Sequence, residues 1–494
     1  MKLSKLLQKA GIAAPSASEI PDIEIGGISS DSRTVRAGDL FVALCGLHRD
    51  GALFAKEALE KGAAFVIAER DVGLADALAV PDAREALARL WDAWYDHPAK
   101  DLTLIGITGT NGKTSTAFML EWILRETGYK TGLIGTVECR CDGKKLTFTN
   151  PDALANMTTP DPAELYGMLA QMRDLGVTHV VMEVTSHALT FQKTAPLRFA
   201  RAVFTNLTVD HLDLHGDMEN YFAAKRKLFA SCGGAIVSLS TPYGARLCAT
   251  LTCPFAEVSP KTVRNIRQYG ADGVGFTLTV SSGAEIEIAL PVPGLFSVEN
   301  AALAAMTADS LGVDATLIKN ALAAFPGVKG RMERVGENAL GIRVFLDYAH
   351  TPDALEKLLS TVRGFAAPHE RILLLFGCGG DRDRGKRRQM GQVASRLADL
   401  LILTSDNCRS EEPDGILRDI LQGVDKEKPY TVIADRRAAV EYAVEIAKAG
   451  DVLLLAGKGH EEYEIRGGER LPFSEREIVG EALRRRAERE GRAH

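Results

Sequence analysis

The chain has 494 residues, 46% of them apolar and 25% charged, and its formal net charge is −6. This length predicts several domains, because a single core rarely grows so large. The acidic balance excludes a general nucleic-acid-binding protein, whose surface would be basic. The eight cysteines show neither a Cys-x-x-Cys pair nor zinc spacing, so we expect free thiols in a reducing compartment. No apolar run is long enough to span a bilayer, and the N-terminus lacks the apolar core of a signal peptide, which predicts a cytoplasmic protein without membrane insertion.

The first predicted domain comprises residues 1–98. Short strands and turns fill it, including the turn at residues 31–33 and the strand at residues 38–42, and an alanine-rich helical pattern ends at His97-Pro98. Proline disfavours helical backbone at the residue before it, so this dipeptide marks a break. We expect a small α/β domain here.

A glycine-bracketed loop at residues 106–114 opens the second predicted domain, residues 99–332. It follows an apolar run at 102–107 and precedes a helical pattern at 115–127. In such a loop, backbone N–H groups and the helix N-terminus hold phosphates, Lys113 reaches the outer phosphates and Thr114 ligates Mg²⁺. Ile107 stands where the strict motif has glycine, and a chance Gly-Lys-Thr is the alternative. The flanking strand and helix favour an ATP or GTP site.

Polar residues end further strands of the same predicted sheet, which we expect to be mostly parallel. Glu183 ends one of them and is a candidate to hold Mg²⁺ opposite Thr114, although it could simply cap a turn. The cluster at residues 210–215 is open between a second Mg²⁺ site, a phosphate contact and a solvated loop. Lys225 lies on a helix predicted at 218–230, where exposed lysines are common. A β-rich insert is predicted at 270–295.

The third predicted domain, residues 333–494, again alternates buried strands with helices. Its strands at 344–346, 372–376, 400–404 and 452–456 each run into a polar or glycine-rich loop. Ligands bind at the carboxyl ends of strands in open α/β sheets, so we expect a second ligand site here. Arg382 is a candidate to grip a carboxylate, whereas Arg387 and Arg388 are expected to form a solvated face. Residues 406–409 have the polarity to enclose an amino acid.

Five motifs in order resemble the Mur ligases of peptidoglycan synthesis. They are Gly109-Thr-Asn-Gly-Lys-Thr114, Asp347-Tyr-Ala-His-Thr-Pro352, Gly377-Cys-Gly-Gly-Asp-Arg382, Asp406-Asn-Cys-Arg409 and Gly457-Lys-Gly-His-Glu461. Within the family, the chain is most similar to the members that add the third residue of the stem peptide. The resemblance implies a UDP-binding α/β domain, a central ATPase-type domain and a Rossmann-like C-terminal domain. It also implies a monomer that uses Mg²⁺ and small-molecule substrates: ATP, UDP-muramoyl-dipeptide and meso-2,6-diaminopimelate.

The resemblance further implies roles for individual residues, as follows. The UDP substrate would contact Ser30, Ser32, His48, Thr158, Thr159, Thr185 and Lys193. ATP would contact Gly109, Thr110, Asn111, Gly112, Lys113, Thr114, Ser115, Asn300, Arg331 and Asp347. Mg²⁺ would be held by Thr114, Glu183, His211 and a carbamylated Lys225, and the last three residues together with Lys113 would be catalytic. The amino acid would contact Arg382, Asp406, Asn407, Cys408, Arg409, Gly457 and Glu461.

The chain departs from the family pattern at three positions. Cys408 replaces the usual proline and removes a fixed backbone angle, while Arg409, which marks diaminopimelate users, is retained. Lys193 stands where arginine is common, and Thr185 where serine is common. The rival hypotheses are the same chemistry on L-lysine or on a folate glutamyl chain, and a nucleotide-switch protein without an amino-acid pocket.

Overall fold

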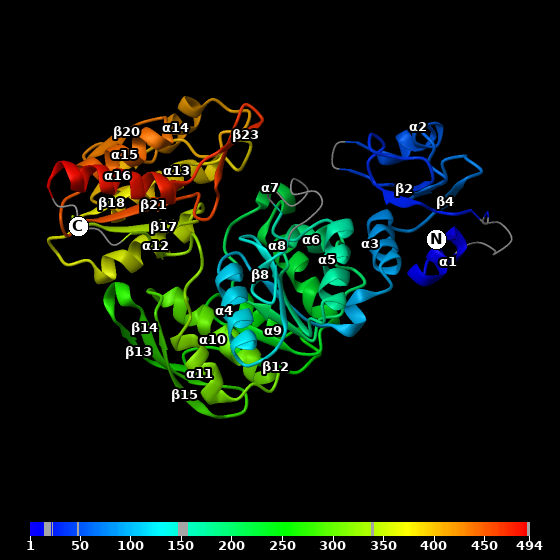
Figure 1. Cartoon of the computed structure of the whole chain (residues 1–494), viewed down its shortest axis with the longest axis horizontal. Helices are drawn as coiled ribbons and strands as arrows, with labels where there is room; N and C mark the ends of the chain where they lie inside the picture. Colours follow the sequence, from blue (N-terminus) through cyan, green and yellow to red (C-terminus); the bar gives the residue numbers. More distant parts are fainter. Residues whose placement is uncertain (14–20, 22, 47–48, 147–156, 337–339, 492–494) are drawn as a thin grey trace.

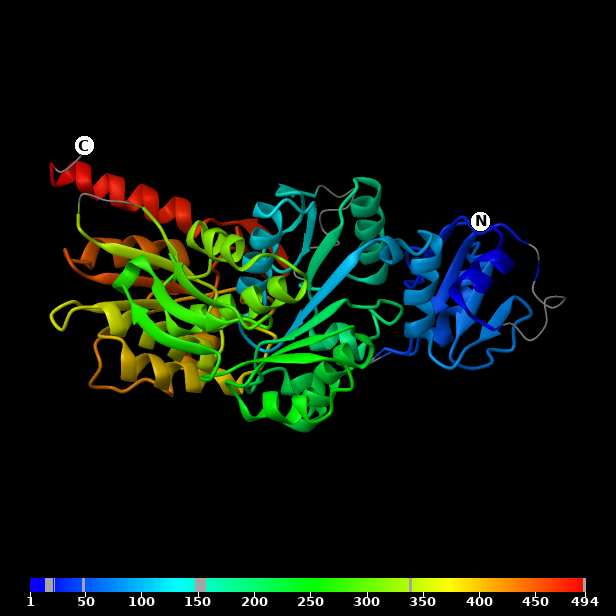
Figure 2. The same ribbon diagram turned by 90° about the horizontal axis from the view of Figure 1, so that it is seen from below.

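The computed structural model describes residues 1–13, 21, 23–46, 49–146, 157–336 and 340–491. Three bodies, each built on a mostly parallel sheet, follow one another along the chain, and the central body lies between the other two in both views (Figure 1, Figure 2). The predicted three-domain α/β class is therefore confirmed. The limits drawn at residues 98 and 332 stay predictions. Among the described residues, no helix combines the length and apolar character needed to cross a membrane.

The first body has a parallel sheet of four strands in the order β1-β2-β3-β4. Their bounds are β1 Gly27–Ser29, β2 Asp39–Ala43, β3 Phe65–Ala68 and β4 Ala77–Ala79. Helices α1 (Leu3–Ala10) and α3 (Ala83–Trp94) pack on one face, and α2 (Ala55–Glu60) packs on the other. All five residues of β2 are buried, as expected of a strand covered on both faces.

The central sheet has the order β12-β11-β10-β5-β9-β6-β7-β8 and is parallel except at β7 and β8. Its strands are β5 Thr103–Thr108, β6 Thr131–Ile134, β7 Cys139–Cys141, β8 Lys144–Lys145, β9 His179–Glu183, β10 Arg201–Phe204, β11 Ala235–Ser238 and β12 Phe255–Val258. The strand β5 lies between β10 and β9 and is parallel to both, so the loops that follow these three strands meet at one edge of the sheet.

Helices cover both faces of the central sheet. Alternate side chains of a strand point to opposite faces, and in β5 apolar side chains on both faces are buried. Ile105 and Ile107 pack with α4 (Lys113–Glu126), α10 (Leu295–Ser310) and α11 (Ala315–Ala323). Leu104 packs on the other side, with α5 (Pro162–Asp174), α8 (Met218–Arg226) and neighbouring segments. The remaining helices are α6 Ser186–Thr190, α7 Leu212–His215 and α9 Pro242–Cys248. The helix predicted at 218–230 is too long, since its last turn is a 3₁₀ helix over Lys227–Ser231.

The predicted β-rich insert is confirmed for its two strands, β14 (Val274–Thr279) and β15 (Glu285–Leu290), whereas a third antiparallel strand, β13 (Val263–Gln268), precedes the predicted range. Exposed and buried residues alternate along β15, and the buried ones join the core around α10 and α11. Figure 1 shows this sheet beneath the C-terminal body.

The C-terminal sheet has the order β16-β17-β21-β18-β19-β20, with only β16 antiparallel. Its strands are β16 Glu333–Arg334, β17 Arg343–Asp347, β18 Ile372–Phe376, β19 Leu400–Leu403, β20 Tyr430–Val432 and β21 Val452–Ala456; a separate hairpin pairs β22 Tyr463–Arg466 with β23 Glu469–Pro472. One face carries α12 Pro352–Phe365, α13 Gly385–Leu397 and α14 Pro413–Leu421, and the other carries α15 Arg436–Ile446 and α16 Glu475–Arg489. The four predicted strands are confirmed, and their loops share one sheet edge.

Candidate active site

The phosphate loop joins β5 to α4 in a backbone conformation that glycine permits. Gly109 has φ +153°, and a Cβ there would collide with the Thr205 hydroxyl oxygen. Gly112 has φ +84° and directly precedes the first helical residue, Lys113. The loop therefore presents the N-terminus of α4, which favours an anion.

Asn206, which sequence reasoning missed, holds this loop from the end of β10. Its carbonyl oxygen accepts a 3.0 Å hydrogen bond from the Thr110 N–H, and its Oδ1 accepts another of 3.0 Å from the Asn111 N–H. The Thr205 hydroxyl donates to the Asn111 carbonyl at 2.6 Å. The loop is thus fixed from outside its own segment.

Two lysine amino groups converge on the carbonyl of Gly109. Lys113 Nζ lies 3.0 Å from that oxygen and Lys225 Nζ lies 2.9 Å from it. Only 2% of Lys225 is exposed, so the expectation of an ordinary exposed lysine is wrong. Burial lowers the pKa of both amines, and the nearby Lys113 charge lowers the pKa of Lys225 further. The predicted pair is therefore brought together in a setting that favours an uncharged Lys225.

Glu183 ends β9 as a fully buried carboxylate. It accepts hydrogen bonds from the Thr114 hydroxyl (2.9 Å), the Thr136 N–H (2.8 Å) and the Thr136 hydroxyl (3.0 Å). Among the described residues, no lysine or arginine lies within ion-pair distance of it. A buried carboxylate beside a threonine hydroxyl offers the hard oxygen ligands that Mg²⁺ prefers, so these residues fit the ion.

His211 lies at the rim, with 44% of its side chain exposed. Its ring is 6.2 Å from that of Tyr221, and Lys225 Nζ lies 4.7 Å over the same tyrosine ring. Burial lowers the pKa of His211 to about 4 against the opposing effect of Asp210. In the described part of the chain, no three His, Cys, Asp or Glu side chains are grouped to hold a metal. Of the four residues predicted to hold Mg²⁺, Thr114 and Glu183 are hydrogen-bonded to each other. The other two, Lys225 and His211, both lie beside the ring of Tyr221.

Two of the predicted nucleotide residues, Asn300 and Arg331, border the loop. Asn300 is buried on α10 and accepts a 3.3 Å hydrogen bond from the Thr116 hydroxyl. Arg331 donates to the Thr114 hydroxyl at 3.3 Å and stacks on Tyr348, 4.4 Å from the ring centre. Asp347 instead holds backbone, accepting from Met332 N–H (2.7 Å) and Ala349 N–H (2.8 Å), and burial raises its pKa.

The residues predicted for the UDP substrate fall into two separate groups. Thr159 and Thr185 border Glu183, since the Thr159 hydroxyl donates to the Glu183 carbonyl at 2.9 Å and accepts from the Thr185 N–H at 3.0 Å. Thr158 contacts the Thr136 hydroxyl at 2.9 Å, and Lys193 pairs with Asp161 at 2.8 Å. Ser30 and Ser32 lie in the first body, and no hydrogen bond between described residues joins them to this group. His48 lies outside the described residues.

Most of the predicted amino-acid pocket forms a buried polar cluster after β19 and β21. Asn407 Nδ2 donates to Glu461 at 2.7 Å, and Asp406 accepts from the Asn407 N–H at 2.6 Å. Burial and the Asp406 charge raise the pKa of Glu461. Gly457 has φ +112°, and a Cβ there would lie 2.6 Å from Asp406 Oδ2. The cluster therefore combines acidic groups with a tightly packed backbone.

The turn that carries Arg409 is held without the family's proline. Cys408 is 1% exposed, and Arg409 has φ +54°. The Arg409 N–H donates to the Ile465 carbonyl at 3.0 Å and its carbonyl accepts from Gly467 N–H at 2.8 Å, so the β22–β23 hairpin fixes the turn. The guanidinium donates to Gly380 O at 2.8 Å. Arg382, in contrast, is exposed.

Arg387 corrects the expectation of a solvated face. Its side chain is 1% exposed and pairs with Glu411 at 2.8 Å and Asp419 at 2.9 Å. Its position on α13 turns it toward α14, whereas Arg388 is exposed as expected. The burial of Arg387 cannot be predicted from the basic residues around it, because both of its acidic partners come from a later segment of the chain.

Two other side chains in this region, Lys458 and Arg436, are buried cations that the sequence did not predict. Lys458 is fully buried between the two glycines of its motif, and Arg436 is 1% exposed beneath the same strand ends. Arg436 donates to the carbonyls of Ser405 (2.8 Å) and Ala456 (2.9 Å) and pairs with Glu475. The sequence could have indicated Lys458, because this residue lies inside the Gly-Lys-Gly-His-Glu motif at 457–461. Arg436 lies in no such motif, so the sequence gives no indication of its role.

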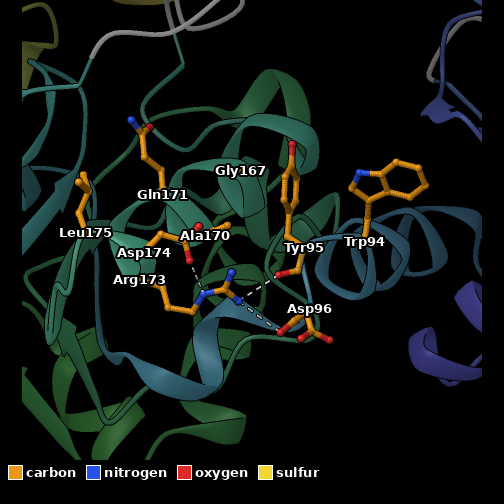
Figure 3. A pocket seen from close by; sticks show the side chains of 9 residues that line it. All are labelled: Trp94, Tyr95, Asp96, Gly167, Ala170, Gln171, Arg173, Asp174 and Leu175. Atoms are coloured by element: carbon orange, nitrogen blue, oxygen red, sulfur yellow. Dashed lines mark hydrogen bonds and ion pairs between the residues drawn. The ribbon is translucent and has the colours of Figure 1, made fainter. Parts of the chain in front are cut away.

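A surface hollow lies at the joint between the first and central bodies (Figure 3). Arg173 spans it, donating to the Tyr95 carbonyl at 3.1 Å, and Trp94 flanks it. Asp96 and His97 nearby adopt positive φ angles of 60° and 53°. None of the predicted site residues lines this hollow, so it belongs to the joint and not to the candidate site.

The phosphate loop and the buried polar cluster after β19 and β21 lie on the two sides of the joint between the central and C-terminal bodies. Besides the Arg331 contact, Asn111 Nδ2 donates to Asp353 on α12 at 2.7 Å. A Cβ on Gly330 would collide with the backbone of Gly459 and His460, so the connector and the glycine-rich motif are in close contact. A phosphate loop on one side of a joint and a buried polar cluster on the other fit an ATP-dependent ligase of the acid–amino-acid class.

Comparison with known proteins agrees with this class. The chain matches the models of the Mur ligase family catalytic domain over residues 24–95, the Mur ligase middle domain over 107–308 and the Mur ligase glutamate ligase domain over 330–459. The chain belongs to the Mur ligase family.

Individual relatives are similar over nearly the whole chain. The UDP-N-acetylmuramoyl-L-alanyl-D-glutamate–2,6-diaminopimelate ligase of Gloeobacter violaceus is 43% identical, with 99% of each chain covered. That of Syntrophomonas wolfei is 41% identical, with 94% of this chain and 95% of the relative covered. A solved structure of a ligase of this name has a TM-score of 0.68 and 30% identity, covering 98% of this chain and 99% of the other. A folylpolyglutamate synthase of Mycobacterium tuberculosis shares the fold, with a TM-score of 0.63, 18% identity and coverage of 76% of this chain and 92% of the other.

Proposed function

We propose that the chain is an ATP-dependent ligase that joins 2,6-diaminopimelate to UDP-N-acetylmuramoyl-L-alanyl-D-glutamate in peptidoglycan precursor synthesis. The observation that carries the proposal is the joint itself. Arg331 spans it, with its guanidinium 3.3 Å from the Thr114 hydroxyl and stacked on Tyr348. A nucleotide site and an amino-acid pocket on the two sides of one joint suit a reaction that activates a carboxylate and then passes it to an amine.

In the first step, the side-chain carboxylate of the D-glutamyl residue attacks the γ-phosphorus of ATP. An oxygen–phosphorus bond forms, the bond to ADP breaks, and the products are an acyl phosphate and ADP. Phosphoryl transfer depends chiefly on positioning and charge stabilisation. The α4 N-terminus and Lys113 supply positive charge, and Arg331 adds a further positive charge beside Thr114.

Thr114 and Glu183 are the residues that would hold Mg²⁺, together with His211 and a carbamylated Lys225. When bound, the ion would neutralise charge on the transferring phosphoryl group. Carbamylation joins CO₂ to an uncharged amine with loss of one proton, and burial favours that uncharged form in Lys225. The product is a carboxylate. Beside Lys113 and the proposed Mg²⁺, a negatively charged carboxylate is favoured over an ammonium group.

In the second step, the amine of the amino acid attacks the acyl carbon, phosphate leaves, and the amine releases a proton. The carboxylates of Asp406 and Glu461 supply acceptors for ammonium groups, Asn407 holds Glu461 in place, and Arg409 supplies a fork for a carboxylate. Diaminopimelate carries a second amine and carboxylate at its far end, whereas L-lysine ends in an ammonium alone. The cationic side chain at position 409 favours the former and repels the latter. The acyl phosphate is prone to hydrolysis, so a closed joint that excludes water preserves it.

The test measures ADP release with UDP-muramoyl-dipeptide and each amino acid in turn. We expect kcat/KM with 2,6-diaminopimelate to exceed that with L-lysine by tenfold or more, roughly the value of one charge-assisted hydrogen bond. A preference for L-lysine would overturn the assignment of the amino acid. ADP release that needs no amino acid would support the nucleotide-switch hypothesis instead.

A further inference from the structure

Lys458 occupies an unusual place for a lysine, at the carboxyl end of β21 with none of its surface exposed. The glycines on both sides have positive φ angles, 112° at Gly457 and 55° at Gly459. A side chain at Gly459 would lie 2.7 Å from the Gly330 carbonyl and 2.8 Å from the Tyr348 side chain. The backbone of Lys458 is therefore fixed from both sides, and its ammonium can reach only a few partners.

Those partners are all parts of the amino-acid cluster or of its wall. Lys458 Nζ donates to Asn407 Oδ1 at 3.0 Å and to the Tyr463 carbonyl at 2.9 Å. It also lies 3.7 Å from Asp406 Oδ1 and 3.9 Å from Glu461 Oε2. A buried charge is costly unless it is paired and hydrogen-bonded, and these four contacts meet that requirement.

The first consequence concerns the side-chain amide of Asn407. Its Oδ1 accepts from Lys458 and, at 3.0 Å, from the Ile465 N–H. With the oxygen held by two donors, the amide nitrogen must point the other way, and it donates to Glu461 at 2.7 Å. Lys458 thus sets the orientation of Asn407, and through it the position of the Glu461 carboxylate.

The second consequence concerns charge. Asp406 and Glu461 are two carboxylates in one buried cluster, and each disfavours the ionised form of the other. The ammonium of Lys458 lies within 4 Å of both. Arg436, a further buried cation, also favours the ionised form of Asp406, but among the described residues its ion pair is with Glu475 and not with either acid of the pocket. Lys458 is therefore the cation that directly joins the two acids of the pocket.

We infer that Lys458 is a positioning residue for the incoming amino acid: it offsets the mutual repulsion of Asp406 and Glu461 and turns the Asn407 amide toward Glu461, so that the two carboxylates receive the ammonium group of the substrate. Lys458 has no exposed surface and does not itself touch the amino acid. The inference rests on the proposed ligase function and adds to it a residue that determines affinity for the amino acid alone.

The experiment compares the steady-state kinetics of Lys458→Met, Lys458→Gln and the wild-type enzyme, with Lys426→Met as control because Lys426 is exposed on a turn of the same domain. Both Lys458 variants remove the charge, and the glutamine retains a hydrogen-bond donor. We expect KM for 2,6-diaminopimelate to rise roughly tenfold to a hundredfold, with KM for ATP and for the UDP substrate within about twofold of wild type. The control variant should match the wild type throughout.

A double-mutant cycle with Glu461→Gln separates positioning from general packing. If Lys458 acts through Glu461, the double variant should have a KM for the amino acid close to that of the worse single variant. The inference would be overturned if the two substitutions multiplied each other's effect on KM for the amino acid, or if that KM did not change. It would also be overturned if all three KM values rose equally, or if neither Lys458 variant folded. If the wild type uses L-lysine, the proposed function fails, but the same comparison made with L-lysine still tests Lys458.

Discussion

In the central domain, the nucleotide site is one contiguous loop between β5 and α4, whereas in the C-terminal domain the amino-acid pocket collects residues from the ends of β19 and β21 and from the β22–β23 hairpin. The loop depends on glycine backbone geometry and on anchors from Asn206. The pocket depends on buried charges that neutralise one another. In the proposed function, phosphate binding would therefore depend on local backbone geometry, and selection of the amino acid would depend on an assembled electrostatic network. The two regions should respond differently to substitution.

The largest expected effect is on the nucleotide side. Lys225→Ala should lower kcat by roughly a thousandfold, the upper range for loss of one charge-stabilising group, while binding of diaminopimelate measured by calorimetry stays near normal. Short-chain carboxylates such as acetate should partly restore activity by filling the vacated space, and removal of dissolved CO₂ should lower wild-type activity. Near-normal activity of the variant would show that Lys225 is only a packing residue.

The next effect tests the scaffold of the amino-acid side. Arg387→Met leaves the partly exposed Glu411 without its main partner and should lower the free energy of unfolding by about 3 kcal/mol, the upper end for hydrogen bonds to a charged group. Arg388→Met, on the exposed side of the same helix, should change it by no more than about 0.5 kcal/mol. Urea unfolding at neutral pH measures both, and equal effects would contradict the buried role of Arg387.

This difference should also depend on pH. Hydrogen bonding to Arg387 is the main cause that lowers the pKa of Glu411 from 4.5 to about 2. A lowered folded-state pKa contributes stability that is fully present above the unfolded-state pKa and is lost as the pH falls through the folded-state value. The wild-type advantage over Arg387→Met should therefore be constant above about pH 4.5 and should shrink toward pH 2. A difference that grew on acidification would refute the assignment.

A smaller effect is expected from the residue that selects the amino acid. Arg409→Ala should erase most of the preference for diaminopimelate over L-lysine, a change of roughly tenfold to a hundredfold in the ratio of the two kcat/KM values. KM for ATP should be unchanged, since the phosphate loop does not contact Arg409. An unaltered ratio would show that the turn at Cys408 directs Arg409 elsewhere.

The smallest effect concerns the contact between the two regions. Asp353, on the first turn of α12, accepts from Asn111 of the phosphate loop, and its side chain is 32% exposed. Asp353→Ala should raise KM for ATP by up to about fivefold, in line with a partly exposed polar contact. Asp414→Ala is a matched control, because Asp414 also follows the first proline of its helix. Equal effects of the two changes would exclude a specific role for this contact.

The sequence predicts the contiguous parts of the molecule well, because a strand, a glycine loop and a helix are encoded within about twenty residues. The β5 loop and the four C-terminal strands are confirmed for this reason. Burial of charged side chains is not encoded locally, since the partners of Arg387 lie on a later segment and those of Lys225 lie on the phosphate loop. The pairs that form the pocket, such as Asn407 with Lys458, required the assembled sheet.

The central claim is that the two regions act in one coupled reaction. The most direct test is the initial rate of ADP release measured with ATP alone, with each second substrate separately, and with both UDP-muramoyl-dipeptide and 2,6-diaminopimelate present. We predict rapid, sustained ADP release only in the complete mixture, in equal amount to the amide product. Release at the same rate without the dipeptide substrate would contradict it.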